Sequence, residues 1–194
     1  MQKLLQVLIM IFTISLLPAQ DVWGGVSVAT PDNLEAVNGN PAGLGLNRNS
    51  QSGMYIPFDS VFTIHSANRT NGFGYDLTYQ FIDGKFPDYF NPADGNVGIG
   101  FSIYDNAYAG LKWNKHKLVD IGFLSRPFNF ASFGMVIQFN DEFTEYYSTT
   151  LGLAFRPLSN HRLTIGVDFN LSKEDSLNYF PHLNIQPMNG ITFS

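Results

Sequence analysis

The chain has 194 residues, of which 14% are charged, and its formal net charge is −5 with no cysteine. The lack of cysteine excludes disulfides, thiolate metal sites and a lipid-modified N-terminal cysteine, and the acidic balance argues against nucleic acid as a partner. Soluble domains carry about a quarter charged residues. This composition, with 18 glycines, 18 phenylalanines and a mean hydropathy of −0.03, instead suits a β-barrel with one apolar and one polar face.

Residues 1–20 have the layout of a secretory signal peptide. Lys3 supplies a positive charge, an apolar run extends from Leu4 to Leu17, and the run PAQ (18–20) ends it with small or polar residues. The alternative is an N-terminal membrane anchor, but the run has about 14 residues and a spanning helix needs about 20. We therefore predict an exported protein, and no later segment reads as a transmembrane helix.

Residues 21–48 read as a compact element without strands. Asp32 or Asn33 could cap one helical turn that Gly39 then stops. The run NPAG (40–43) is a tight-turn signal. We predict that this short element precedes the strands.

Residues 49–194 fall into short segments in which large apolar residues occupy every second position. Because a strand turns successive side chains to opposite faces, each segment has one apolar face and one small or polar face. The clear segments are 73–81, 97–103, 132–139, 149–156 and 162–171. Weaker segments lie around 53–65, 107–113 and 117–125, with 181–187 and 190–194 as candidates for two more. The pattern predicts eight to ten antiparallel strands in up-and-down order.

The polar face of these segments favours a transmembrane β-barrel over a secreted soluble β-sandwich, which stays the alternative. The segments are about 9–11 residues long, the length that a tilted strand needs to cross a bilayer. Their polar face is rich in Gly, Ser and Thr, as in a polar lumen, and aromatic residues gather near the segment ends. The isolated charges predicted to line the lumen are Asp76, Asp120, Arg156, Arg162 and Asp168.

An internal repeat supports an architecture of hairpins. Residues 120–140 align without a gap with residues 150–170. The identical pairs are Gly122/Gly152, Arg126/Arg156, Pro127/Pro157, Phe139/Phe169 and Asn140/Asn170. Since proline cannot donate to a ladder, Arg-Pro predicts the end of a strand, with the arginine reaching toward the membrane interface. Duplication and convergent turn chemistry both explain the repeat.

The motif NPAGL lies soon after the signal peptide and before the glycine- and aromatic-rich strands; its residues are Asn40, Pro41, Ala42, Gly43 and Leu44. In this context it resembles the FadL-like outer-membrane family, which includes hydrophobic-compound transporters and the PorV-type proteins of type IX secretion. The resemblance implies that residues 21–48 form a hatch in the barrel lumen, braced by the lumen charges, within a barrel of about fourteen strands. Because the chain stops inside what reads as a fresh strand (191–194), we expect an incomplete barrel, with a self-closed barrel of eight to ten strands as the alternative.

A second resemblance concerns the barrel-like N-terminal region of some signal peptide peptidase A-type proteins. It is carried by NPAGLG (40–45) and RPLSNHRLTIGVDF (156–169). The Ser/Lys machinery of those peptidases has no counterpart in this sequence. The four histidines are dispersed, and neither a metal-ligand spacing nor a GxSxG elbow occurs, so no catalytic residue, metal site or cofactor is predicted.

The sequence therefore predicts a protein of the cell outer membrane, with outer-membrane lipid as its partner. The leading function is a FadL-like channel or carrier whose ligand is a hydrophobic small molecule. The alternatives are a non-catalytic barrel that anchors or hands on a secretion-system partner, and a membrane module on a downstream peptidase domain.

Overall fold

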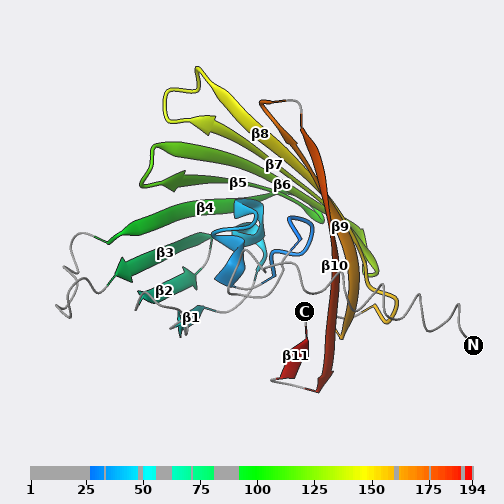
Figure 1. The fold of residues 1–194 in the computed structure, drawn as a ribbon. Coiled ribbons are helices and arrows are strands. Elements are labelled where there is room, and N and C mark those ends of the chain that lie inside the picture. Colours follow the sequence, from blue (N-terminus) through cyan, green and yellow to red (C-terminus); the bar gives the residue numbers. More distant parts are fainter. Residues whose placement is uncertain are drawn as a thin grey trace, which may run out of the picture.

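The computed structural model describes residues 27–32, 34–47, 50–55, 63–70, 72–80, 92–159, 162–174, 176–188 and 191–193. Across these ranges the chain is almost entirely β-structure, in one antiparallel sheet of eleven strands (Figure 1). Each strand pairs with its neighbours in the sequence, so the predicted all-β, up-and-down architecture is confirmed. The helical elements described are two short 3-10 turns, η1 (Leu34–Ala36) and η2 (Pro41–Gly45). Within the described part of the chain, no helix is long and apolar enough to span a membrane.

The strands follow the predicted segments closely. They are β1 (Gln51–Tyr55), β2 (Thr63–Thr70), β3 (Phe73–Gln80), β4 (Asp94–Tyr104), β5 (Ala107–Asn114), β6 (Leu118–Phe128), β7 (Ala131–Asn140), β8 (Tyr146–Phe155), β9 (Leu163–Ser172), β10 (Leu177–Met188) and β11 (Ile191–Phe193). The weak segment around 53–65 contains parts of both β1 and β2, which is one reason why the count exceeds the predicted eight to ten. The predicted signal peptide (1–20), residues 21–26 and most of the expected 83–96 loop lie outside the described residues, and β4 begins at the end of that loop.

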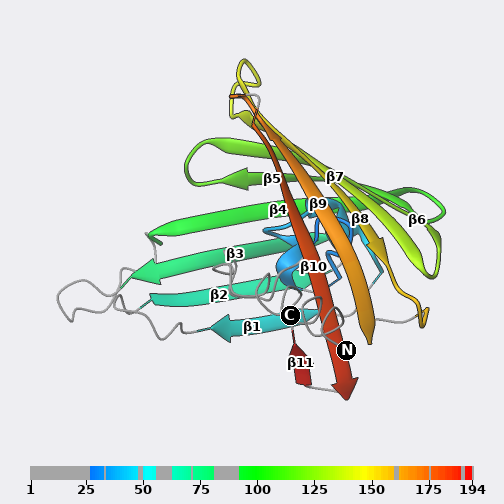
Figure 2. The same ribbon diagram turned by 45° about the vertical axis from the view of Figure 1, so that its right-hand side comes forward.

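The sheet is strongly curved, and residues 27–47 lie against its concave face (Figures 1 and 2). Adjacent strands follow one another from β1 to β11 without a crossover. Among the described residues β1 pairs only with β2, and β11 pairs only with β10. The described ladder is therefore an open curved sheet.

The two Arg-Pro dipeptides of the repeat end their strands differently. β8 stops at Phe155, directly before Arg156-Pro157, as predicted. β6 instead continues through Arg126-Pro127 to Phe128, which corrects the expected strand end there. The register with β7 shifts between Ser125 and Phe128. Because Pro127 has no N–H to donate, the strand passes this position only with an irregular ladder.

The convex face of the sheet carries exposed apolar side chains in continuous rows. One row runs across seven strands in register; it contains Phe101, Ala109, Phe123, Met135, Leu151, Phe169 and Tyr179. Five of these side chains are exposed, whereas Met135 is half-buried and the small Ala109 is buried. Phe101 is 52% exposed and Leu151 is 48% exposed. A contiguous apolar surface of this kind is rare on monomeric soluble proteins and marks an interaction with another apolar phase or surface.

An exposed ion pair joins the turn before β8 to the turn after β9. The Lys173 ammonium donates a hydrogen bond to the Glu145 carboxylate. This hydrogen bond and the attraction between the charges lower the pKa of Glu145 and raise that of Lys173. Because solvent surrounds both groups, the pair contributes little to stability.

Candidate functional site

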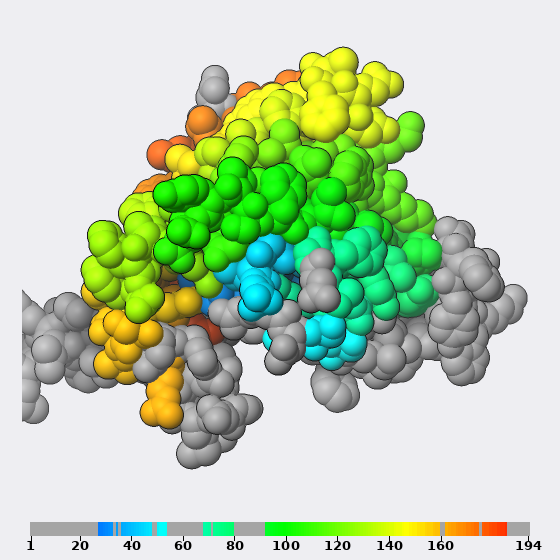
Figure 3. Space-filling view, turned by 180° about the vertical axis from the view of Figure 1, so that it is seen from behind, coloured from blue at the N-terminus to red at the C-terminus, as the bar shows by residue number. Residues whose placement is uncertain are grey.

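The candidate site is the contact between the concave face and residues 27–47, which we call the inner segment. Its second turn, η2, begins with Pro41, and the Asn40 side chain caps it by accepting a hydrogen bond from the Ala42 N–H at 3.0 Å. Leu44 packs with Ala36 of η1 and with Val37 and is 1% exposed, and Ala42 is fully buried with Leu124 of β6. The blue and cyan atoms of this part of the chain lie beneath the arch of green strands in Figure 3. The NPAGL motif is thus the part of the inner segment that is buried against the sheet.

A set of glycines on the concave face lets the inner segment approach the strands closely. We call them the seat glycines; they are Gly74, Gly98, Gly100, Gly110, Gly122, Gly134 and Gly152. Several are paired in register across neighbouring strands, for example Gly100 with Gly110 and Gly134 with Gly152. A methyl group on Gly100 would lie 2.5 Å from the Pro41 carbonyl oxygen. The glycines of the alternating pattern therefore accommodate a second piece of backbone.

The start of the inner segment is bound by a carboxylate on β9. Ser27 donates its hydroxyl to Asp168 Oδ1 at 2.6 Å, and the Val28 N–H donates to Asp168 Oδ2 at 2.9 Å. His182 Nε2 on β10 lies 3.4 Å from the same Oδ2. Asp168 is 5% exposed, so its charge depends on these donors for the solvation that burial removes.

Asn40 links the inner segment to itself and to the sheet. Its amide nitrogen donates to the Val28 carbonyl at 2.7 Å and to the Phe123 carbonyl of β6 at 3.0 Å. Together with the cap on η2, these bonds use both ends of a fully buried amide. No other side chain of similar size offers two donors and an acceptor in this shape, which explains an asparagine before Pro41.

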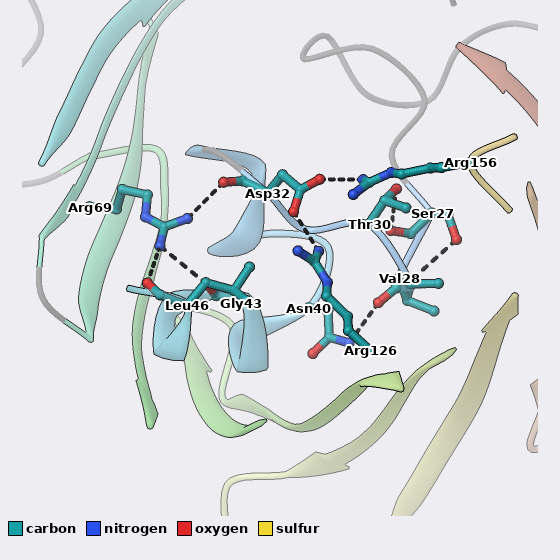
Figure 4. Close-up of polar contacts among 11 residues, drawn as sticks. Ser27, Val28, Thr30, Asp32, Asn40, Gly43, Leu46, Arg69, Arg126 and Arg156 are labelled. Atoms are coloured by element: carbon teal, nitrogen blue, oxygen red, sulfur yellow. Dashed lines mark hydrogen bonds and ion pairs between the residues drawn. The ribbon is translucent and has the colours of Figure 1, made fainter. Parts of the chain in front are cut away.

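Arg69 on β2 binds the backbone of the inner segment. Its guanidinium donates to the carbonyl oxygens of Asp32, Gly43 and Leu46 at 3.1, 3.2 and 3.1 Å (Figure 4). The side chain is 2% exposed. Arg69 thus supplies a donor to three carbonyl groups of the inner segment; the Gly43 carbonyl also accepts the Leu46 N–H that caps η2, at 3.1 Å.

Asp32 is the charged centre of the site. Its two carboxylate oxygens form ion pairs with Arg126 on β6 and Arg156 directly after β8, one oxygen to each guanidinium (Figure 4). The three side chains are 11–15% exposed. The arginines that the repeat places at equivalent positions therefore turn to the inner segment rather than toward the strand ends, which corrects the expectation that they reach the interface.

A second polar network lies farther along the concave face and meets the inner segment at Asn38. Asn38 donates to the Asp76 carboxylate on β3, and the Lys112 ammonium on β5 donates to the Asn38 carbonyl oxygen at 3.0 Å. Lys112 also pairs with Asp120 at 2.6 Å. Gln138 on β7 donates to Asp120 at 2.9 Å. These contacts join four strands to one residue of the inner segment.

The structure places four of the five predicted lumen charges on the concave face, in or next to contacts with the inner segment. Asp76, Arg156 and Asp168 contact it directly, and Asp120 does so through Lys112. Arg162 lies in the turn before β9 with an exposed side chain.

Several residues of the site had no counterpart among the predicted site residues: Ser27, Asp32, Asn38, Arg69, Lys112 and Arg126. The repeat does carry a signal for Arg126, because it occupies the position equivalent to Arg156.

A pocket of about 280 Å³ lies beside the Asp32 ion pairs, at the end of the strands where β4 joins β5, β6 joins β7 and β8 joins β9. It is lined by both arginines, by Leu46 of the inner segment and by polar residues of the strands and turns. Elsewhere in the described ranges, no three His, Asp or Glu side chains come close enough together to hold a metal ion.

Comparison of the chain with protein-family models, with curated proteins and with solved structures finds no match.

Proposed function

We propose that this chain forms the wall and the plug of an outer-membrane β-barrel that acts as a FadL-like channel or carrier. The observation that carries the proposal is the contrast between the two faces of one curved sheet. The convex face exposes rows of apolar side chains, and the concave face binds the inner segment through buried polar groups. This arrangement is typical of a strand wall with lipid outside and a filled lumen inside.

Lipid is the partner that best fits the convex face. β4, β6, β7, β8 and β9 are 10 or 11 residues long. A tilted strand of about 9–11 residues crosses the hydrocarbon core of a bilayer. The exposed residues of β8 are Tyr147, Leu151, Leu153 and Phe155, none of them charged. A signal peptide at residues 1–20 would deliver such a chain to the outer membrane.

The inner segment is well suited to act as a plug. Its contacts come from β2 to β9, so it extends across most of the concave face. A solute that crosses along this face must pass the inner segment or displace part of it. By resemblance to FadL-like transporters, we propose a hydrophobic small molecule as the cargo, with the buried charges bracing the plug rather than contacting the ligand.

Deletion of residues 21–48 from the mature chain tests the role of the plug. We expect vesicles that contain the full chain to take up a hydrophobic probe, such as a fluorescent fatty acid, slowly. In vesicles with the deletion variant, we expect faster uptake of this probe and faster leakage of a small polar dye. The physical reason is that the deletion removes the inner segment from the concave face, and with it the backbone that blocks the path of a solute along this face.

The control for this experiment is Glu145→Gln, which alters an exposed turn and leaves the inner segment intact. It is expected to behave as the unaltered chain. Uptake and leakage that stay the same after the deletion would contradict a carrier and favour a barrel that only anchors another protein.

A further inference from the structure

The pocket beside Asp32 has a wall of hydrogen-bond donors. Besides the apolar Leu46, Phe128 and Ala131, its lining includes Asn106, Tyr108, Arg126, Ser132, Arg156 and Ser159. These residues come from β5, β6, β7 and the turns beyond β4 and β8. At about 280 Å³ the pocket is slightly smaller than the sites of drug-sized ligands, which begin at about 300 Å³. A small ligand, or one end of a longer ligand, fits it best.

The charges at this pocket favour an anion. Arg126 and Arg156 both pair with the single carboxylate of Asp32, so the three side chains together carry one net positive charge. Each guanidinium has five N–H donors in a planar fork, whereas Asp32 offers one oxygen to each. The trio therefore has more donors than Asp32 can accept from.

The Arg156 side chain shows this excess most clearly. Its Nε is buried and has no hydrogen-bond partner within the described residues, and Arg156 itself lines the pocket. Because Nε is closed off from solvent, an acceptor in the pocket would bond the terminal nitrogens of Arg156, and the unpartnered Nε shows that the donors of this guanidinium exceed its acceptors. Carboxylate and phosphate groups match the guanidinium fork because two of their oxygens accept parallel N–H bonds.

We propose that this pocket binds a small oxyanion, a carboxylate or phosphate group, which shares the Arg126 and Arg156 guanidiniums with Asp32. The ligand accepts hydrogen bonds from Arg156 and from the neutral donors of the wall. Because the ligand and Asp32 compete for the same guanidiniums, binding weakens the attachment of the inner segment to β6 and β8. This site does not depend on transport, so it stands independently of the proposed function.

Isothermal titration of the full mature chain in detergent micelles tests the site with inorganic phosphate and acetate as probes, against chloride at equal ionic strength. We expect phosphate or acetate to bind with measurable heat and chloride to give none. Arg156→Lys keeps the positive charge that pairs with Asp32 but removes the planar fork of N–H donors, and we expect it to weaken binding about tenfold. The matched control, Lys173→Gln, removes a cation in an exposed turn and should leave binding unchanged.

The Asp32→Asn variant distinguishes oxyanion binding by the two arginines from a purely structural role of their ion pairs with Asp32. It removes the competing carboxylate and leaves both guanidiniums, so we expect it to bind phosphate more tightly than the unaltered chain. Any one of three results would overturn the proposal. They are equal heats for phosphate, acetate and chloride, unchanged phosphate binding by Arg156→Lys, and phosphate binding by Asp32→Asn that is no tighter than that of the unaltered chain. A chain that inserts into vesicles but binds no oxyanion refutes the site alone, while one that binds an oxyanion but does not insert refutes the proposed function alone.

Discussion

Asp32→Asn is expected to lower the free energy of unfolding by about 3 kcal/mol and to loosen the inner segment near β6 and β8, while the contacts of Asn40 and Ala42 with β6 stay in place. The reason is that one carboxylate pairs with two guanidiniums that are only 14–15% exposed. Removal of the shared partner leaves both arginines largely buried without a counter-charge from Asp32. Breaking a buried pair from one side costs about 3–5 kcal/mol, and the residual exposure together with the asparagine oxygen places this case at the lower end.

Urea unfolding of the chain in micelles measures this change, and limited proteolysis reports whether the inner segment has become accessible. The matched control is Asp105→Asn, because Asp105 lies exposed in the turn between β4 and β5, at the same end of the strands. The control should unfold as the unaltered chain does. Equal stability of the two variants would show that the Asp32 ion pairs do not hold the inner segment.

Gly134→Ala is expected to displace the start of the inner segment and to destabilise the chain by about 1–3 kcal/mol, the usual cost of overpacking. A methyl group at Gly134 would overlap the Val28 carbonyl oxygen and lie 2.6 Å from the Ala29 nitrogen. Both obstacles are backbone atoms, which cannot rotate away as a side chain can. We expect the inner segment to move, because its contacts with the sheet are fewer than those within the ladder.

Hydrogen exchange of the Val28 N–H, which is bonded to Asp168, measures the displacement. Its exchange should accelerate at least tenfold in Gly134→Ala, which corresponds to about 1.4 kcal/mol of lost protection. Gly95→Ala is the matched control, since the nearest atom to its methyl group is the mobile end of Leu77 at 3.0 Å, away from the inner segment. If both variants exchange alike, the seat glycines do not determine where the inner segment lies.

The strands were largely predictable because their signal is local. In 97–103 and 163–171 the apolar residues recur with period two, and a strand is the structure that puts all of them on one face. Up-and-down order follows because short turns can join only antiparallel neighbours. The ends were less certain, as β6 shows by continuing through Pro127 with a shifted register.

The site was predictable only in part, because its contacts join residues far apart in the chain. Asp32 pairs with Arg126 and Arg156 across 94 and 124 positions, and no local pattern specifies such a pairing. Asp168 and Asp76 could be assigned to the polar face by alternation, but their partners Ser27 and Asn38 could not.

The role of the glycines shows the same limit. Along each strand they read as small residues of a polar face, and the sequence offers no sign that another backbone approaches there. Only the register, which aligns Gly100 with Gly110 and Gly122, turns separate spacers into a continuous surface. The role of these glycines therefore follows from how the strands pair and not from their positions along the sequence.

The central claim, that the convex face lies in lipid, is tested most directly by a single tryptophan in the middle of that face. In a chain with Trp23→Phe and Trp113→Phe, Leu151→Trp puts the reporter at an exposed, outward position of β8, and Glu142→Trp puts it in an exposed turn as the control. In vesicles of brominated phosphatidylcholine, we expect the fluorescence at position 151 to be quenched by the lipid bromines and shielded from aqueous iodide, with the reverse at position 142. Quenching at position 151 by iodide and not by brominated lipid would contradict the account.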